Sequence, residues 1–202
     1  MSGAPAMAAS VIASVTDASG APVADAVVYA KPMTGTIVPS RVASHASIEQ
    51  LDREFVPYVT AVQKGTTINF PNRDPLLHHV YSFSPAKQFE IKLYSGDPAR
   101  GILFDKTGIV TLGCNIHDWM LGYILVVDTP YFAKTDQTGV ARISELVAGE
   151  YEIHVWHPQQ RENVAAKPSR LDAKSNAETQ LTLQVALRKQ KFKPPASPIQ
   201  YK

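Results

Sequence analysis

Runs of β-branched and aromatic residues alternate along most of the chain with clusters of Gly, Pro, Asn, Asp and Ser, as is typical of strands joined by turns. Near the start, residues 11–30 predict two strands around a turn at 16–22. Further strands are expected in a series of short segments: 55–62, 66–70, 80–83, 109–112, 121–127, 140–143, 151–156 and 180–187. The pattern therefore predicts an all-β fold.

Composition excludes several classes of protein. The 202 residues include 15 prolines and 11 glycines, which suits many turns, and no apolar run is long enough for a membrane span. The net charge is +2 with Lys and Arg scattered, so nothing favours nucleic acid as a partner. A single cysteine excludes an intramolecular disulfide and the usual zinc sites of two or four cysteines.

That cysteine lies close to a histidine and a methionine. Cys114, His117 and Met120 offer a thiolate, an imidazole and a thioether within seven residues. Two histidines and a cysteine in a plane, with a weak axial methionine, form the mononuclear blue-copper site, which serves both Cu(I) and Cu(II). The spacing predicts a copper site that exchanges single electrons and needs a second histidine from elsewhere in the chain.

His78 and His79 are the candidates for that second histidine. Neighbours on a strand point to opposite faces, so only one of the two is expected to reach the metal, and the residues alone leave open which one. Surface or structural roles are expected for His45, His154 and His157, since these are the ordinary roles of histidines outside a ligand pattern.

Two stretches resemble the cupredoxins, and the amicyanin-like and plastocyanin-like members in particular. Residues 67–72 read Thr-Ile-Asn-Phe-Pro-Asn, followed after five residues by His-His-Val, and Cys-x-x-His-x-x-Met comes downstream. The resemblance covers residues 45–128 and extends to exported bacterial proteins of the methylamine-utilisation type. It implies a Greek-key β-sandwich that binds one copper ion through His78, Cys114, His117 and Met120.

By the same resemblance, Asn72, His79 and Asn115 are expected beside the ligands. His79 stands where the family has an asparagine whose main-chain N–H donates to the cysteine sulfur, a contact that tunes the metal. In multicopper oxidases and copper nitrite reductases, a histidine next to the cysteine binds a second, catalytic copper. Cys114 is flanked by Gly113 and Asn115 instead. The chain is therefore expected not to be an enzyme.

The residues around His117 depart from the amicyanin pattern. The amicyanin pattern has prolines around the histidine of this loop, whereas this chain has Ile116 and Asp118. A loop without proline is less stiff, and a neighbouring carboxylate favours imidazolium. We therefore expect His117 to protonate and leave copper in the reduced protein at mildly acidic pH.

The two ends of the chain carry a second pattern. Val-Thr-Asp-x-x-Gly-x-Pro-Val-x-x-Ala-x-Val at 15–28, with Thr-Asp-x-x-Gly at 135–139 and Leu-Val-Ala-Gly-Glu-Tyr at 146–151, resembles the carboxypeptidase-regulatory-like sandwich, an Ig/transthyretin-like fold. This predicts one discontinuous domain, residues 9–40 and 129–188, with a cupredoxin domain at 41–128 inserted in it or packed on it. The alternative is one larger sandwich with a C-terminal extension. Residues 1–8 are expected to be disordered and 189–202 to form a flexible, basic, proline-rich tail.

The expected function is electron transfer, with a c-type cytochrome or a dehydrogenase as the redox partner. Copper storage or delivery is the alternative, and the four dispersed methionines argue against it. A third possibility, adhesion or scaffolding, concerns the second sandwich. The start lacks the basic and apolar regions of an export signal, but Ala6-Met7-Ala8 resembles the end of one. We therefore expect a periplasmic or otherwise exported protein.

Overall fold

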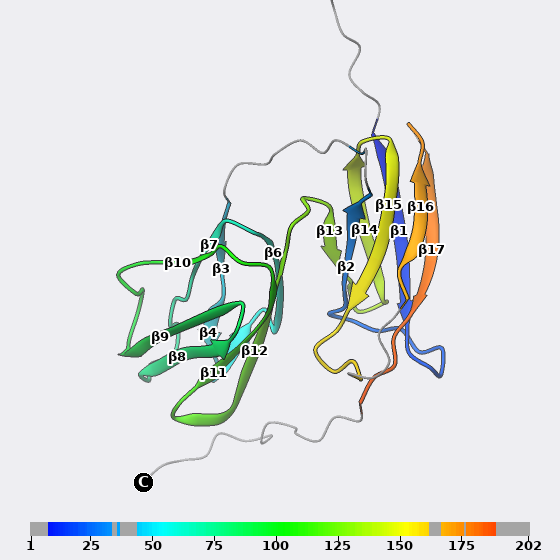
Figure 1. The fold of residues 1–202 in the computed structure, drawn as a ribbon. Helices are drawn as coiled ribbons and strands as arrows, with labels where there is room; N and C mark the ends of the chain where they lie inside the picture. The colour runs from blue at the N-terminus through cyan, green and yellow to red at the C-terminus, as the bar shows by residue number, and fades with distance from the viewer. Residues whose placement is uncertain (1–7, 34–35, 37–43, 162–166, 176, 189–202) are drawn as a thin grey trace, which may run out of the picture.

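The computed structural model describes residues 8–33, 36, 44–161, 167–175 and 177–188. These residues form strands, turns and loops without any helix, which confirms the predicted all-β fold (Figure 1). In this part of the chain, accordingly, no helix could span a membrane. Of the start expected to be disordered, residues 1–7 lie outside the described residues, and Ala8 is exposed and directly precedes the first strand. The expected flexible tail, residues 189–202, also lies outside the described residues.

Strands from the two ends of the chain form one sandwich, which we call the chain-end sandwich. A three-stranded sheet has the order β14-β1-β17, and a four-stranded sheet the order β13-β2-β15-β16. β1 runs antiparallel to β14 and parallel to β17. A buried apolar core that includes Val11, Val28 and Ile153 fills the space between the sheets. The strands are β1 (Ala9–Thr16), β2 (Val27–Pro32), β13 (Phe132–Lys134), β14 (Val140–Leu146), β15 (Gly149–Trp156), β16 (Ser169–Ala173) and β17 (Glu178–Gln184).

The strands between residues 45 and 127 form the central sandwich. Its largest sheet has the order β6-β12-β11-β8-β9, and it is accompanied by the sheet β10-β7-β3 and the hairpin β4-β5. Phe70, Phe104 and Leu112 belong to its buried core. The strands are β3 (His45–Ser47), β4 (Glu49–Leu51), β5 (Glu54–Val56), β6 (Val59–Gln63), β7 (Thr66–Asn69), β8 (His78–Ser84), β9 (Lys87–Tyr94), β10 (Ile102–Phe104), β11 (Gly108–Cys114) and β12 (His117–Val127).

The period-2 pattern of the sequence sets which side chains enter these cores. Along β1, buried residues alternate with partly exposed ones, so that Val11, Ala13 and Val15 face inward. One predicted strand is wrong: residues 55–62 are split into β5 and β6, with Pro57 between them. Proline has no N–H for a ladder hydrogen bond, so the pairing changes at this position.

The two sandwiches meet through a small apolar cluster. Val59, Leu125 and Val127 of the central sandwich pack with Val27 of β2, and Trp156 of β15 joins them. Figure 1 shows β13 and β2 beside β6 and β12 at this junction. The side of the β6-β12-β11 sheet that faces away from its own core is therefore partly covered by the chain-end sandwich.

Candidate metal centre

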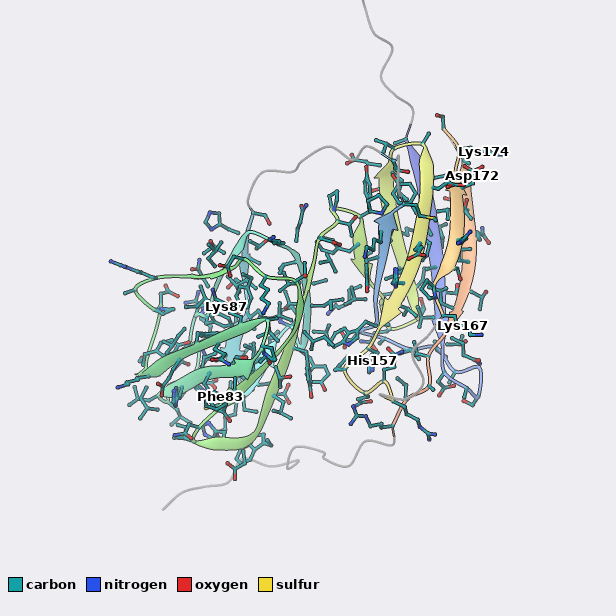
Figure 2. All side chains as sticks on the ribbon, in the orientation of Figure 1. Phe83, Lys87, His157, Lys167, Asp172 and Lys174 are labelled. Atoms are coloured by element: carbon teal, nitrogen blue, oxygen red, sulfur yellow. The ribbon has the colours of Figure 1, made fainter. Side chains whose placement is uncertain are left out.

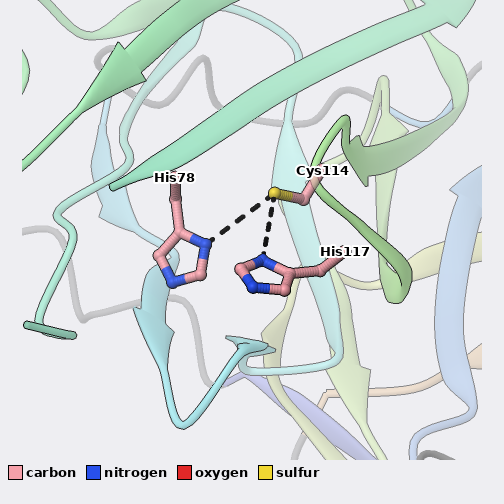
Figure 3. Close-up of side chains that lie close together, drawn as sticks. All are labelled: His78, Cys114 and His117. Carbon is pink, nitrogen blue, oxygen red and sulfur yellow. Dashed lines mark hydrogen bonds between the residues drawn. The ribbon is translucent and has the colours of Figure 1, made fainter. Parts of the chain in front are cut away.

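Three of the predicted donors lie together inside the central sandwich. Nδ1 of His78 and Nδ1 of His117 are each 3.7 Å from Sγ of Cys114, and both rings point toward the sulfur (Figure 3). The donor atoms of all three lie within 4.8 Å of one another, and all three residues are buried. Among the described residues, no other group of three His, Cys, Asp or Glu side chains is this compact.

A tight hairpin brings Cys114 and His117 together. Cys114 is the last residue of β11, His117 is the first of β12, and the two are paired across the turn at Asn115 and Ile116. The segment from Cys114 to Met120, predicted as a loop, therefore contains only a two-residue turn, and its second part belongs to β12. Gly113 is the residue before the cysteine, and a Cβ there would come within 2.7 Å of the Tyr81 ring. The absence of a side chain at 113 therefore allows β8 to lie close to the cysteine.

An irregularity in β12 accounts for the position of Met120. Residues three apart on a regular strand face opposite sides. Between its pairings with Cys114 and Gly113, however, β12 runs from His117 to Leu121, so residues 118–120 bulge out of the ladder. Both His117 and Met120 are consequently buried, and Met120 belongs to the same apolar cluster as Cys114.

The carboxylate of Asp74 holds His78, although no motif in the sequence indicates this contact. Nε2 of His78 lies 2.6 Å from Oδ2 of Asp74, which leaves Nδ1 facing the sulfur. The Asp74 carboxylate also accepts hydrogen bonds from the main-chain N–H groups of Asp52 (2.7 Å) and Arg53 (2.9 Å). Those two residues form the β4–β5 turn and have φ of 54° and 60°. Asp74 thus connects a candidate ligand to a neighbouring hairpin.

Asn72, predicted to lie beside the ligands, shapes the segment that leads to His78. Its Nδ2 donates to the carbonyl groups of Leu76 (2.7 Å) and Tyr94 (2.9 Å), and its Oδ1 accepts from the N–H of Asp74 (3.0 Å). The hydroxyl of Tyr94 in turn hydrogen-bonds Gln50 and the carbonyl of Phe70. Asn72 therefore holds the segment in place through main-chain groups and Asp74.

His79 and His78 point to different sides of β8, as the strand geometry predicts. The His79 ring lies 5.8 Å from that of Tyr81, and its Nε2 is 3.0 Å from Oε1 of Glu90 on β9. The main chain of His79 is one of the groups that lower the pKa of the Cys114 thiol, and the role that the resemblance implies for His79 remains a prediction. Asn115 is exposed in the turn, where the N–H of Ile116 is a further donor to the sulfur.

The surroundings of Cys114 favour the thiolate. Burial raises the pKa of its thiol, but the hydrogen bonds from His78 and from the N–H groups of His79 and Ile116 outweigh burial, so the pKa falls below its ordinary value. Burial lowers the pKa of His78, but the hydrogen bonds to Cys114 and Asp74 raise it more. The pKa of His78 therefore lies above its ordinary value. The ring and the sulfur therefore stabilise each other's charged forms in the absence of metal.

His117 behaves differently from His78. Burial lowers its pKa, and the positive charges of His78 and Arg53 lower it further. The negative charge of Asp74 acts in the opposite direction and raises the pKa of His117. Asp118 was expected from its place in the sequence to favour imidazolium, but it is exposed and is not among the groups that shift this pKa. The Trp119 ring lies 5.4 Å from the His117 ring. A neutral imidazole is the form that binds metal, so these surroundings suit a ligand.

The spacing of the donors fits a single metal ion. Bonds of about 2.3 Å to sulfur and about 2.0 Å to nitrogen, about 120° apart, would separate the two donors by about 3.7 Å. Both sulfur–nitrogen distances have this value. A soft thiolate and two imidazoles, with a thioether buried in the same apolar cluster as the thiolate, are of the donor types that copper uses in blue sites.

No family model matches the sequence, and no curated protein matches it. Solved structures do. A purple cupredoxin from Nitrosopumilus maritimus is 20% identical with a TM-score of 0.37, over 41% of this chain and 99% of that one. An amicyanin variant in the reduced state is 19% identical with a TM-score of 0.36, over 40% and 80%. A copper-containing nitrite reductase from Thermus scotoductus is 20% identical with a TM-score of 0.39, over 58% and 28%. Similarities this distant assign neither a ligand nor an activity to this chain.

Proposed function

We propose that the protein is a mononuclear copper protein of the cupredoxin type and that it carries single electrons. The observation that supports this most directly is the buried cluster in which Nδ1 of His78 and Nδ1 of His117 each lie 3.7 Å from Sγ of Cys114. A copper ion bound there would accept and release one electron. We propose these three residues as its strong ligands and Met120 as its weak axial ligand.

The protein's own residues would keep the site rigid, which lowers the barrier to electron exchange. Asp74 fixes the His78 ring with Nδ1 toward the sulfur. The N–H groups of His79 and Ile116 stabilise the negative sulfur. The two-residue turn between β11 and β12 limits the movement of Cys114 relative to His117. These contacts support a site whose geometry changes little between oxidation states.

Addition of Cu(II) to the wild type and to Cys114→Ser tests the proposal. We expect an intense thiolate-to-copper absorption band and a narrow-hyperfine EPR signal in the wild type, and neither in the variant. His45→Ala is the matched control, because His45 is an exposed histidine on β3, and it should keep both signals. A colourless wild type that has bound Cu(II) would refute the proposal.

The carrier role is supported by exposed apolar residues that flank the candidate ligands in the chain. Leu76, Leu77, Ile116 and Leu121 are between 41% and 51% exposed. We propose that they surround the point of contact with a c-type cytochrome or a dehydrogenase. Rapid, repeated oxidation by a c-type cytochrome is expected; slow oxidation combined with ready transfer of Cu(I) to a chelator would indicate copper storage or delivery instead.

We assign the protein no catalysis of its own, since Cys114 is flanked by Gly113 and Asn115. The copper-loaded protein should therefore show no nitrite reduction when supplied with a reductant.

We also propose residues 41–128 as the cupredoxin domain, similar to exported methylamine-utilisation proteins. Residues 9–40 and 129–188 would form a separate carboxypeptidase-regulatory-like domain, as the pairing of β1 with β14 and β17 supports. Cell fractionation should find the protein in the periplasm.

A further inference from the structure

An aromatic pair lies on the outer face of the β6-β12-β11-β8-β9 sheet, away from the core of the central sandwich. Phe83 is 78% exposed, the largest fraction for any large apolar side chain among the described residues. Its ring lies 5.1 Å from the ring of Tyr81, two residues earlier on β8. Val80 and Ser82 alternate with these two residues and are buried on the other side of the strand. The two rings therefore form an apolar surface that faces solvent.

The chain-end sandwich leaves this surface uncovered. It contacts the opposite half of the sheet, through Val59 of β6 and Leu125 of β12. β8 and β9 lie at the other end of the strand order, and Figure 1 shows them on the side of the central sandwich away from the chain-end strands. Adjacent exposed rings on an open sheet face are a surface that a further segment can cover.

The last described residue, Arg188, lies close to this surface. Arg188 lines a cavity at the junction of the two sandwiches, and so does Thr111 of β11. The N–H of Thr111 donates to Oγ of Ser84 on β8 at 2.9 Å, and Ser84 is the neighbour of Phe83. Figure 2 labels Phe83 on the central sandwich and His157, another residue that lines the cavity, just beyond β15 on the side toward it. The residues that follow Arg188 therefore start about one cavity's width from Phe83.

Main-chain hydrogen bonds fix this starting point. The N–H of Arg188 donates to the carbonyl of Gln159 at 2.7 Å, and the N–H of Arg161 donates to the carbonyl of Ala186 at 2.9 Å. The segment after β17 is thereby held against the turn after β15. A segment that continues from Arg188 consequently begins on the chain-end sandwich, next to the central one.

The sequence after Arg188 suits an aromatic surface. It contains Phe192 and the run Pro-Pro-Ala-Ser-Pro at 194–198. Prolines favour the polyproline II helix in advance, and proline-rich segments bind aromatic surfaces in that form at a small cost in entropy. At about 3.1 Å per residue, the chain from Arg188 to Pro194 spans up to about 19 Å. Neighbouring strands such as β11 and β8 are only about 4.8 Å apart, so this reach is sufficient.

We propose that residues 189–202 dock on this surface, with Pro194 and Pro195 against the rings of Tyr81 and Phe83. The segment joins the chain-end sandwich, where it starts, to the central sandwich. The expectation of a flexible tail rests on local pattern alone, and a segment without an apolar period becomes ordered where another surface supplies the contacts. The proposal does not depend on copper, because no candidate ligand takes part.

Charge neither drives nor prevents the contact. The segment carries several lysines, and β9 offers them both signs of charge, in Glu90 and Lys92. Glu90 is paired with Tyr81 across the strands, and its carboxylate lies 3.0 Å from Nε2 of His79. Docking would also cover the ring of Tyr81, which packs against Gly113 beside Cys114. The segment would thus shield one side of the candidate metal centre.

NMR of the full-length, metal-free protein tests the proposal by comparing the wild type with Phe83→Ala. In the wild type we expect NOE contacts between the Phe83 ring and the protons of Pro194 or Pro195, and backbone order at residues 190–193 close to that of the sheets. In Phe83→Ala both should be lost. Because Phe83 is largely exposed, the variant should keep its fold, which unchanged methyl shifts of the buried Val110 would verify.

Leu103→Ala is the matched control. Leu103 is 47% exposed on β10 in a different sheet, so its truncation should leave residues 190–193 as ordered as in the wild type. Residues 190–193 as mobile in the wild type as in Phe83→Ala would overturn the proposal. So would Phe83 ring signals that shift with protein concentration, because a second copy would then cover the surface.

Trypsin gives an independent measurement, since cleavage after Lys191 requires the segment to leave the surface. We expect cleavage there to be at least about fivefold faster in Phe83→Ala than in the wild type, and unchanged in Leu103→Ala. Pro194→Ala with Pro195→Ala should increase the rate as Phe83→Ala does. Equal rates in the wild type and in Phe83→Ala contradict the proposal.

Discussion

Asp74 and His78 lie four residues apart in the chain, and Oδ2 of the first is 2.6 Å from Nε2 of the second. The same carboxylate holds the N–H groups of Asp52 and Arg53 in the β4–β5 turn. A carboxylate on the outer nitrogen of a histidine selects the tautomer whose other nitrogen can bind a metal. Asp74 therefore links the stability of a hairpin to the orientation of a candidate ligand.

Asp74→Asn is the first prediction. An amide carries no negative charge to pair with His78. It also has only one oxygen that can accept hydrogen bonds, whereas the two N–H groups of the hairpin turn now bond to both carboxylate oxygens. We expect the free energy of unfolding of the metal-free protein to fall by about 1.5–3 kcal/mol, in the range for hydrogen bonds to charged groups. Affinity for Cu(II) should fall by about 10- to 100-fold. Urea denaturation and competition with a chelator would measure these changes.

Asp118→Asn is the control for this prediction. Asp118 is next to His117 in sequence but is exposed, so its substitution should change stability by less than about 0.5 kcal/mol. If the Asp118 variant lost more copper affinity than the Asp74 variant, Asp74 would not be the carboxylate that orients the metal ligand.

A second prediction concerns Gly113, against which the Tyr81 ring packs. A methyl group at 113 would come within 2.7 Å of a ring carbon, so either the ring or the end of β11 must move. We expect Gly113→Ala to cost about 1–3 kcal/mol, as overpacking does, and to shift the copper absorption band because Cys114 is the next residue.

Tyr81→Ala should partly rescue this variant, because it removes the ring that clashes. The combined loss of stability in Gly113→Ala/Tyr81→Ala is therefore expected to be smaller than the sum of the two single losses. Strict additivity would show that the methyl group is harmful for another reason.

A third prediction arises from two matching turns in the chain-end sandwich. Oδ1 of Asp17 accepts from the N–H and hydroxyl of Ser19 and from the N–H of Ala21. Oδ1 of Asp136 does the same with Thr138 and Val140. The side-chain hydrogen bond from Ser19 or Thr138 is the main reason that the pKa of each carboxyl lies below its ordinary value of 3.8.

A lowered pKa in the folded state means that each ionised carboxylate stabilises the fold above the ordinary pKa. This contribution is lost as pH falls through the lower, folded-state value. Asp17→Asn and Asp136→Asn should therefore reduce stability between about pH 4 and 7, and the difference from wild type should shrink toward about pH 2. Urea midpoints measured across this pH range would check it; a difference that does not depend on pH would contradict it.

The fourth prediction tests the junction between the sandwiches. Leu125 is 6% exposed and packs with Val27 of β2, so Leu125→Ala should cost about 2–4 kcal/mol. Leu103→Ala is the matched control, because Leu103 is 47% exposed and its truncation should cost less than about 0.5 kcal/mol. Equal effects on thermal unfolding would mean that the cluster contributes little to stability.

Local patterns in the sequence predict much of this fold. Alternation identifies β1 and β15, and turn residues locate the hairpins at 16–22 and 135–139. The edge strand β9 was not predicted, although Phe89, Ile91 and Leu93 alternate with polar residues and would have indicated it. The edge strand β16 has only five residues, too few for a clear apolar period. Pairing between distant strands, such as β1 with β17, leaves no local signal at all.

The candidate site shows the same division. The three nitrogen and sulfur donors expected from the sequence do lie together, and their role as ligands remains a prediction. The contact of Asp74 with His78 could not be read from the sequence, because it depends on a hairpin with an ordinary composition. The bulge at residues 118–120 was equally hidden, although the odd spacing between His117 and Met120 required some such irregularity.

The parallel pairing of β1 with β17 has a consequence for the order of folding. β1 leaves the ribosome early, but both of its sheet partners, β14 and β17, are made only after the whole central sandwich. At about 5–20 residues per second, several seconds separate these events. The central sandwich can close during that interval, while Val11, Ala13 and Val15 remain exposed on an unpaired strand. The nascent chain therefore carries an unpaired, apolar strand, and with it a risk of aggregation, until β14 and β17 have been synthesised.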